Sequence, residues 1–138
     1  MNHRELATIE EALGFVLPGF YREFMLRYPE SLLDAKPVDW KPIVEWEFAN
    51  IPDRIIEMNR YVREQEAGYF LEDEPWPHEF FVIGEEEGGA ENFYAIRRTG
   101  DDETVYMYHH EDEEILPTHA KSLPAFHEWM IEYFAQFK

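Results

Sequence analysis

The fold class follows from residues 80–110, which read FFVIGEEEGGAENFYAIRRTGDDETVYMYHH. Three runs rich in β-branched and aromatic residues, at 80–84, 93–98 and 104–110, alternate with acidic segments that contain glycine. This series predicts three antiparallel strands joined as a meander. Because hairpin connections alternate between the ends of a sheet, we expect the acidic segments 85–91 and 108–114 at one end, and 99–103 at the other.

Helical periodicity surrounds the meander. Apolar spacing, capping residues and stop signals predict four helices, over residues 3–13, 18–28, 53–66 and 122–137. The proline-rich segment 29–42 predicts a connecting loop, and the alternation in IVEWEF predicts a strand over 43–48. The predicted fold is therefore α+β, with a mainly antiparallel sheet flanked by an N-terminal helix pair, a middle helix and a C-terminal helix. At 138 residues, the chain is expected to form a single domain over 1–138.

Charge is the unusual feature of the composition. The chain carries 30 acidic and 12 basic residues, a net charge of −18. Residues 64–114 hold 17 acids against only Arg97 and Arg98, which leaves −15 in that segment. Such a balance disfavours direct nucleic-acid or membrane binding and favours a cationic partner. The longest apolar runs are far too short to span a bilayer, and MNHRELATIEE has no signal-peptide core, so we expect a cytoplasmic protein.

Enzyme chemistry finds little support in the sequence. The chain has no cysteine and no G-x-S-x-G motif, and Ser122 is predicted to cap a helix. His109 and His110 have metal-ligand chemistry, but neighbours on a strand point to opposite faces and are not spaced as in HExxH. The pair Gly88 and Gly89 follows three glutamates that would repel a phosphate. We therefore expect no catalytic residues, no metal and no cofactor.

The acidic segments are the candidate partner-binding site. Any one exposed carboxylate is ordinary solvated surface, but −15 within one segment destabilises the fold by self-repulsion, which favours a functional reason. The candidate residues are Glu85, Glu86, Glu87, Glu91, Asp101, Asp102, Glu103, Glu111, Asp112, Glu113 and Glu114, together with Trp76. Trp76 lies between two prolines and either packs on the sheet, the favoured alternative, or anchors a partner. Trp46 and Trp129 are predicted core residues, and Trp40 is left open.

The order of motifs resembles the SUKH superfamily, which is related to fungal cell-wall assembly and killer-toxin-resistance regulators. The similar segments are IEEALGFVLPGFYREFM at 9–25, PWPHEFFVIGEEEGGAENFYAI at 75–96, TVYMYHHED at 104–112 and the aromatic C-terminal helix. The resemblance implies an α+β domain without known catalysis, whose bacterial members are largely immunity proteins that neutralise a cognate toxin, often a nuclease. It supplies no catalytic residues.

The expected function is therefore a non-enzymatic immunity protein whose acidic face binds a basic toxin. One alternative is a regulatory or scaffold protein of the same superfamily that binds a non-toxin partner. The other is a metal-dependent enzyme that uses His109 and His110. The sequence leaves the oligomeric state and the identity of the toxin open.

Overall fold

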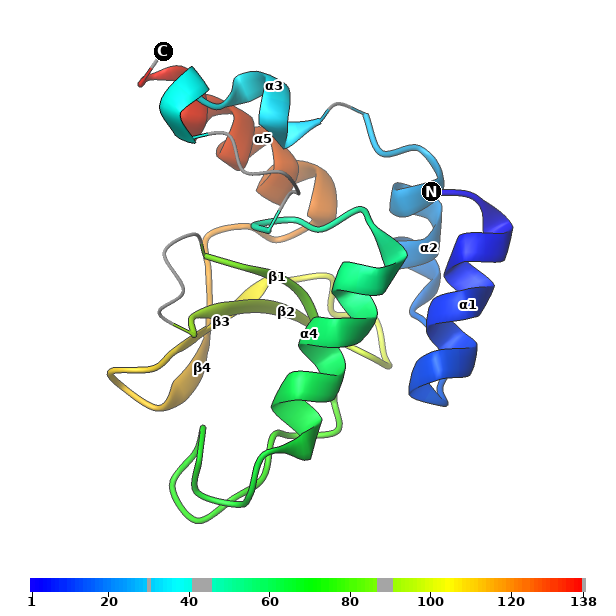
Figure 1. The fold of residues 1–138 in the computed structure, drawn as a ribbon, viewed down its shortest axis with the longest axis vertical. Helices are drawn as coiled ribbons and strands as arrows, with labels where there is room; N and C mark the ends of the chain where they lie inside the picture. Colours follow the sequence, from blue (N-terminus) through cyan, green and yellow to red (C-terminus); the bar gives the residue numbers. More distant parts are fainter. Residues whose placement is uncertain (30, 41–45, 87–90, 138) are drawn as a thin grey trace.

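The computed structural model describes residues 1–29, 31–40, 46–86 and 91–137, and these form an α+β fold (Figure 1). In chain order the elements are α1 (His3–Leu13), α2 (Gly19–Leu26), α3 (Leu32–Ala35), the 3₁₀ helix η1 (Val38–Trp40), α4 (Pro52–Glu64), β1 (Phe80–Glu85), β2 (Phe93–Arg97), β3 (Tyr106–His109), β4 (Glu114–Pro117) and α5 (Leu123–Ala135). The predicted fold class and the four predicted helices are confirmed, with shifted ends for some elements.

The strands form one antiparallel sheet in the order β1-β2-β3-β4. The meander predicted from residues 80–110 supplies the first three strands. The fourth strand, Glu114–Pro117, was not predicted, because Glu and Pro are poor strand formers and the run is only four residues long. Its place at the sheet edge explains why it tolerates Pro117, since an edge strand needs backbone donors on one side only.

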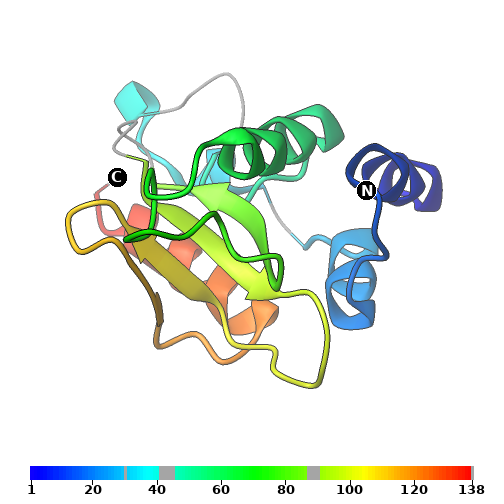
Figure 2. The ribbon, with the colours of Figure 1, turned by 90° about the horizontal axis from the view of Figure 1, so that it is seen from below.

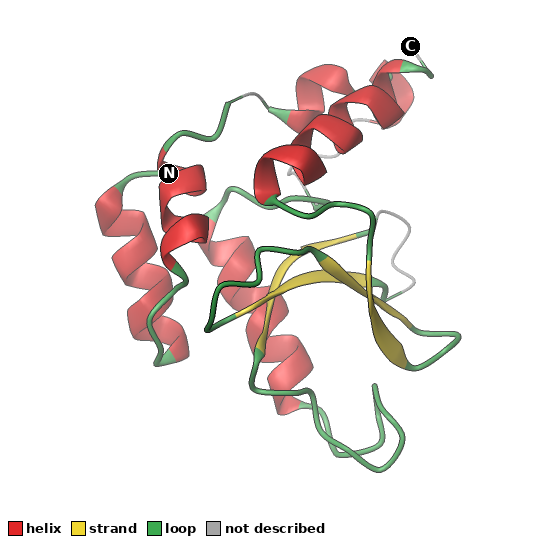
Figure 3. Cartoon of the chain, turned by 180° about the vertical axis from the view of Figure 1, so that it is seen from behind, coloured by secondary structure: helices red, strands yellow, loops and turns green. Residues whose placement is uncertain are grey.

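Helices α4 and α5 lie on opposite faces of the sheet (Figure 2). Neighbouring residues of β2 show this alternation directly. The Phe93 ring lies 6.4 Å from that of Tyr61 in α4, and the Tyr94 ring lies 4.8 Å from that of Phe126 in α5. On the α4 side, the long loop between α4 and β1 (Figure 3) adds buried aromatic rings, which include Phe70. The core is therefore built on both faces.

The N-terminal helices follow the sequence closely. The α1 helix starts with a reciprocal capping box between Asn2 and Glu5, and ends at Gly14, whose φ of +78° is left-handed. The α2 helix ends at Leu26, earlier than the predicted residue 28, because Arg27 already leaves helical geometry at φ −122°.

The outer edge of β1 is closed by groups from outside the sheet. The side chain of Asn59 in α4 pairs with Val82 as a neighbouring strand would: its Oδ1 accepts from Val82 N at 2.8 Å, and its Nδ2 donates to Val82 O at 2.8 Å. Farther along, Glu85 N donates to Trp46 O and Ala49 N donates to Ile83 O. This cover removes an exposed edge that could pair with another chain.

The prediction of a strand over 43–48 is wrong where it can be compared. Glu47 and Phe48 form a turn beside β1, Trp46 is only half-buried, and 43–45 lie outside the described residues. Gly84 explains the geometry, because a Cβ there would lie 1.8 Å from the carbonyl oxygen of Glu47. The segment lies against the outer edge of β1, next to the bulge between Val82 and Gly84, and does not form a strand there.

The predicted loop over 29–42 also contains structure. Within its described part, α3 starts at Ser31, whose hydroxyl accepts a hydrogen bond from Leu33 N, and η1 follows. Lys36, between these two short helices, is fully buried and forms an ion pair with Glu47, with its Nζ 2.8 Å from the carboxylate. The ion pair fixes the segment around α3 to the turn before α4.

The C-terminal helix starts as predicted, with the Ser122 hydroxyl accepting from Ala125 N. The prediction that Trp129 belongs to the core is wrong, because its side chain is 49% exposed. The residues of α5 that are buried are Leu123, Phe126, His127, Met130 and Phe134. Apolar residues therefore cover more of the helix surface than the sheet can bury.

Within the described ranges, no helix is long and apolar enough to cross a membrane.

Candidate interaction surface

Two of the three acidic segments meet at one end of the sheet, as the meander predicts. The β1–β2 connection and the β3–β4 loop leave the sheet at the same end, and Asn92 joins them. Its Oδ1 accepts a hydrogen bond from His110 N at 2.9 Å and lies 2.8 Å from His110 Nδ1. We call this region the acidic end and define it by Glu85, Glu86, Glu91, Glu111, Asp112, Glu113 and Glu114. Glu87 lies outside the described residues.

The β3–β4 loop exposes the largest group of carboxylates. Glu111, Asp112, Glu113 and Glu114 are all exposed, and none has a hydrogen bond or ion pair from its side chain to another described residue. The loop closes through the bond from Glu113 N to His109 O, with Glu113 in the left-handed region at φ +52°. Four charges therefore stand next to one another in water without a cation from the described part of the chain.

The β1–β2 connection is different, because Glu85 is half-buried and Glu91 is hydrogen-bonded within the fold. Burial, and then the charge of Glu91, raise the pKa of Glu85. Glu91 accepts hydrogen bonds from the hydroxyls of Tyr61 and Tyr69, the second at 3.2 Å. The hydrogen bond to Glu91 is the main reason that the pKa of Tyr61 is raised. Of the described acids in this connection, Glu86 is the one that is exposed.

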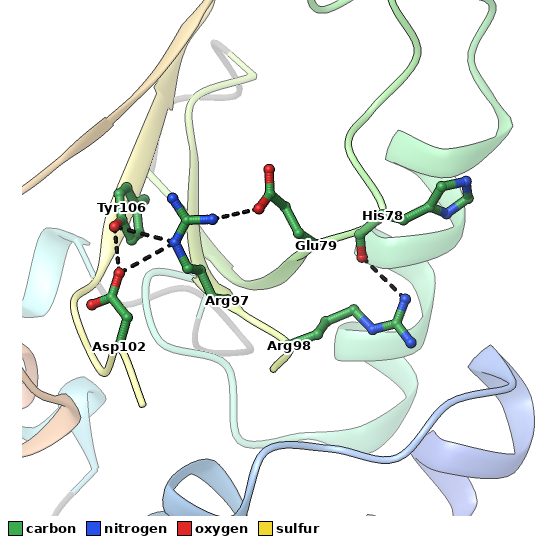
Figure 4. Close-up of polar contacts among 6 residues, drawn as sticks. All are labelled: His78, Glu79, Arg97, Arg98, Asp102 and Tyr106. Atoms are coloured by element: carbon green, nitrogen blue, oxygen red, sulfur yellow. Dashed lines mark hydrogen bonds and ion pairs between the residues drawn. The ribbon is translucent and has the colours of Figure 1, made fainter. Parts of the chain in front are cut away.

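The turn 99–103 lies at the opposite end of the sheet, and its central acid is also engaged (Figure 4). Asp102 accepts from Tyr106 Oη at 2.5 Å, from Thr104 N at 2.9 Å and from Arg97 Nε at 3.2 Å. These bonds, that from Tyr106 first, lower the pKa of Asp102 to about 2. Asp102 therefore closes the turn, and the exposed carboxylates here are Asp101 and Glu103.

Arg97 and Arg98, the two basic residues within 64–114, contact other residues of the protein at this same end of the sheet. Arg97 also pairs with Glu79, while Arg98 donates to the carbonyl oxygen of His78 at 3.0 Å (Figure 4). The Arg98 guanidinium lies 3.8 Å from the centre of the Phe15 ring. Neither arginine stands among the exposed carboxylates of the acidic end, where it could offset their charge.

Trp76 does not belong to the surface. Its side chain is 3% exposed, and Nε1 donates to Phe80 O at 3.0 Å. Rings of Phe70, Phe93 and Tyr108 surround it at centroid distances of 5.6–6.2 Å. The favoured packing alternative is confirmed, and the candidate role of Trp76 as a partner anchor is wrong because no ring face is open.

No metal centre is visible in the described part of the chain, where no three His, Cys, Asp or Glu side chains are grouped to hold an ion. His109 is half-buried in β3, and the His110 ring is engaged by Asn92. Sequence reasoning missed Asn92, Tyr61 and Tyr69, which organise the acidic end. No local signal marks them, since each acts on a residue at least 18 positions away.

The comparison with protein families matches residues 2–130 to the SMI1 / KNR4 family (SUKH-1). The chain belongs to this family. The match covers every strand and all helices except the last turns of α5. SUKH-1 membership supports a function of the immunity or regulatory type, and its members are generally non-catalytic immunity proteins. Neither the curated proteins nor the solved structures gave a match.

Proposed function

We propose that this SUKH-1 protein is a cytoplasmic, non-enzymatic immunity protein that binds and neutralises a basic toxin through the acidic end. The observation that carries the proposal is the group of exposed carboxylates at Glu86 and Glu111–Glu114, on two loops joined through Asn92. Toxins that act on nucleic acids bind an anionic substrate, so their active-site clefts are basic. An acidic surface seated in such a cleft excludes the substrate by occupying its place.

The charges of the acidic end favour the complex with a cationic partner over the free protein. Adjacent like charges at Glu111–Glu114 repel one another in the free protein, and a cationic partner relieves that repulsion. Complementary charge also raises the association rate, which matters for a protein that must capture a toxin before it acts. Glu91 and Asp102 contribute less, because hydrogen bonds within the fold already hold their carboxylates. Glu85 contributes less because it is half-buried and its raised pKa disfavours the charged form.

The test is a protection assay with the natural partner. The protein is purified from its native host at low salt, the bound partner is identified by mass spectrometry, and the partner is expressed with and without this protein. We expect the partner alone to stop growth and co-expression to restore it. A partner that is harmless when expressed alone would overturn the immunity proposal and favour a regulatory or scaffold role.

Two charge-reversal variants test whether the acidic end is the surface that binds the partner. The test variant is Glu111→Lys, Asp112→Lys and Glu114→Lys, and the control is Glu11→Lys, Glu23→Lys and Glu64→Lys. Both raise the net charge by the same amount at exposed positions. Glu5 and Glu10 are unsuitable as controls, because Glu5 caps α1 and Glu10 pairs with Arg22 at 2.7 Å. We expect only the test variant to lose protection.

A further inference from the structure

A groove of about 590 Å³ lies beside the acidic end, bounded by α5, η1 and the end of β1. Its walls include the aromatic side chains of Trp40, Trp129 and Tyr133, and its acidic groups are Asp39, Glu47 and Glu86. Glu86 belongs to both the groove and the acidic end. The groove is therefore placed where a partner that covers the acidic end would reach it.

Three side chains of the groove wall, Trp40, Trp129 and Tyr133, belong to a row of four exposed aromatic rings that Phe137 completes. Trp129 contacts Tyr133 at a ring distance of 5.8 Å, Tyr133 contacts Phe137 at 5.3 Å, and Phe137 contacts Trp40 at 4.9 Å. Each of these side chains is 38–49% exposed. Four adjacent, half-open aromatic rings on the surface of a soluble protein are typical of an interaction site.

The charge of the groove determines which occupant fits. The buried Lys36 forms an ion pair with Glu47, and its Nζ lies 5.0 Å from the centre of the Phe134 ring. Asp39 and Glu86, in contrast, are exposed. No lysine or arginine is among the described residues that line the groove. The lining therefore combines open ring faces with uncompensated carboxylates. A second copy of a chain with a net charge of −18 would add repulsion at this place.

We propose that the groove is the docking site for an arginine side chain of the partner protein. The guanidinium stacks on the exposed ring of Trp129 and pairs with a carboxylate of the groove lining, Glu86 or Asp39. Arginine fits better than lysine, because its planar and weakly hydrated cation combines ring stacking with bidentate contacts to a carboxylate. The choice of a basic protein as occupant rests on the proposed function.

A direct test uses a short probe instead of the unidentified partner. An acetylated and amidated hexapeptide of alternating arginine and glycine is titrated into the ¹⁵N-labelled protein, and the indole signals are followed by NMR. We expect saturable shifts of the Trp40 and Trp129 signals, with those of Trp46 and Trp76 unchanged. The matching lysine peptide should bind about two- to five-fold more weakly, and a glutamate peptide should cause no shift.

Variants separate the groove from general charge attraction. Trp129→Leu keeps an apolar side chain but removes the ring, and should weaken the arginine peptide about two- to five-fold, whereas Val16→Ala, at a 77% exposed position elsewhere, should leave it unchanged. The docking site is wrong if the arginine peptide binds no more tightly than the lysine peptide, and if both bind wild type and Trp129→Leu equally well. Signal shifts that depend on protein concentration without peptide would also overturn it, because they would assign the groove to a second copy.

The protection assay distinguishes this inference from the proposed function. We expect Trp129→Leu to weaken protection while Val16→Ala retains it. If Trp129→Leu protects as well as wild type while the Glu111, Asp112 and Glu114 reversal fails, the groove inference is wrong and the acidic end still stands. If the partner proves harmless, the immunity function is wrong, and the peptide titration still reports on the groove.

Discussion

Replacement of Asn59 by leucine should be among the most damaging single substitutions in the sheet region. The Asn59 side chain is fully buried and supplies both a donor and an acceptor to the backbone of Val82. Leucine has nearly the same shape and supplies neither. The N–H and C=O of Val82 would then be buried without partners, at about 1–3 kcal/mol each, so the expected loss is about 2–6 kcal/mol.

Urea denaturation measures this loss. With a slope of about 2 kcal/mol/M, the midpoint of Asn59→Leu should fall by about 1–3 M. Glu64→Ala, an exposed position in the same helix, should stay within about 0.5 kcal/mol of wild type. Hydrogen exchange gives a second readout, since the Val82 amide should be protected in wild type and exchange much faster in the variant. A stability loss below about 1 kcal/mol with an unchanged Val82 amide would refute the role of Asn59 as a substitute strand.

Three further expectations concern stability. Gly84→Ala should cost at least about 1–3 kcal/mol in urea denaturation, because the new Cβ would collide with the Glu47 carbonyl; wild-type stability would contradict the close approach. Asp102 has its pKa lowered to about 2 from 3.8, so its stabilisation is complete above pH 4 and is lost as the pH falls toward 2. The difference in unfolding free energy between wild type and Asp102→Asn should shrink over that range, and a constant difference would contradict the hydrogen-bonded carboxylate. Trp129 is 49% exposed, so Trp129→Ala should lower the unfolding free energy by about 1–2 kcal/mol. Phe126 is 1% exposed, so Phe126→Ala should lower it by about 3–5 kcal/mol. Equal losses would mean that Trp129 is a core residue.

The parts of the fold that the sequence predicts are those with strong local signals. The helix over His3–Leu13 has a cap, an apolar stripe and a terminal glycine, and the three strands of residues 80–110 are dense in β-favouring side chains. The shared end of the two acidic loops follows from meander geometry alone. These features need no knowledge of distant contacts.

The parts that were missed depend on tertiary contacts. The strand Glu114–Pro117 is held by pairing with β3, and the residues at its two ends disfavour the conformation. The turn at Glu47 can approach β1 this closely because residue 84 is a glycine, since a Cβ there would lie 1.8 Å from the Glu47 carbonyl oxygen. Trp129 has the spacing of a core residue, but the sheet buries only one side of α5.

The sequence predicts the candidate site as a pattern of charge, and the contacts in the structure show which of its carboxylates are exposed. Composition marks all its carboxylates alike, whereas the structure divides them into exposed groups such as Glu111 and engaged groups such as Asp102 and Glu91. The division depends on tyrosine hydroxyls, and two of these come from α4 and the loop that follows it. No sequence pattern near Glu91 indicates them.

Association kinetics with the identified partner test the electrostatic role of the acidic end most directly. The association rate is measured by surface plasmon resonance between about 0.1 and 1 M salt, where the Debye length falls from about 10 to 3 Å. Wild type and the Glu11, Glu23 and Glu64 reversal should associate rapidly at low salt and slow steeply as salt rises. The Glu111, Asp112 and Glu114 reversal should start slow and change little. A salt-independent rate for wild type, or equal losses in the two variants, would contradict recognition through the acidic end.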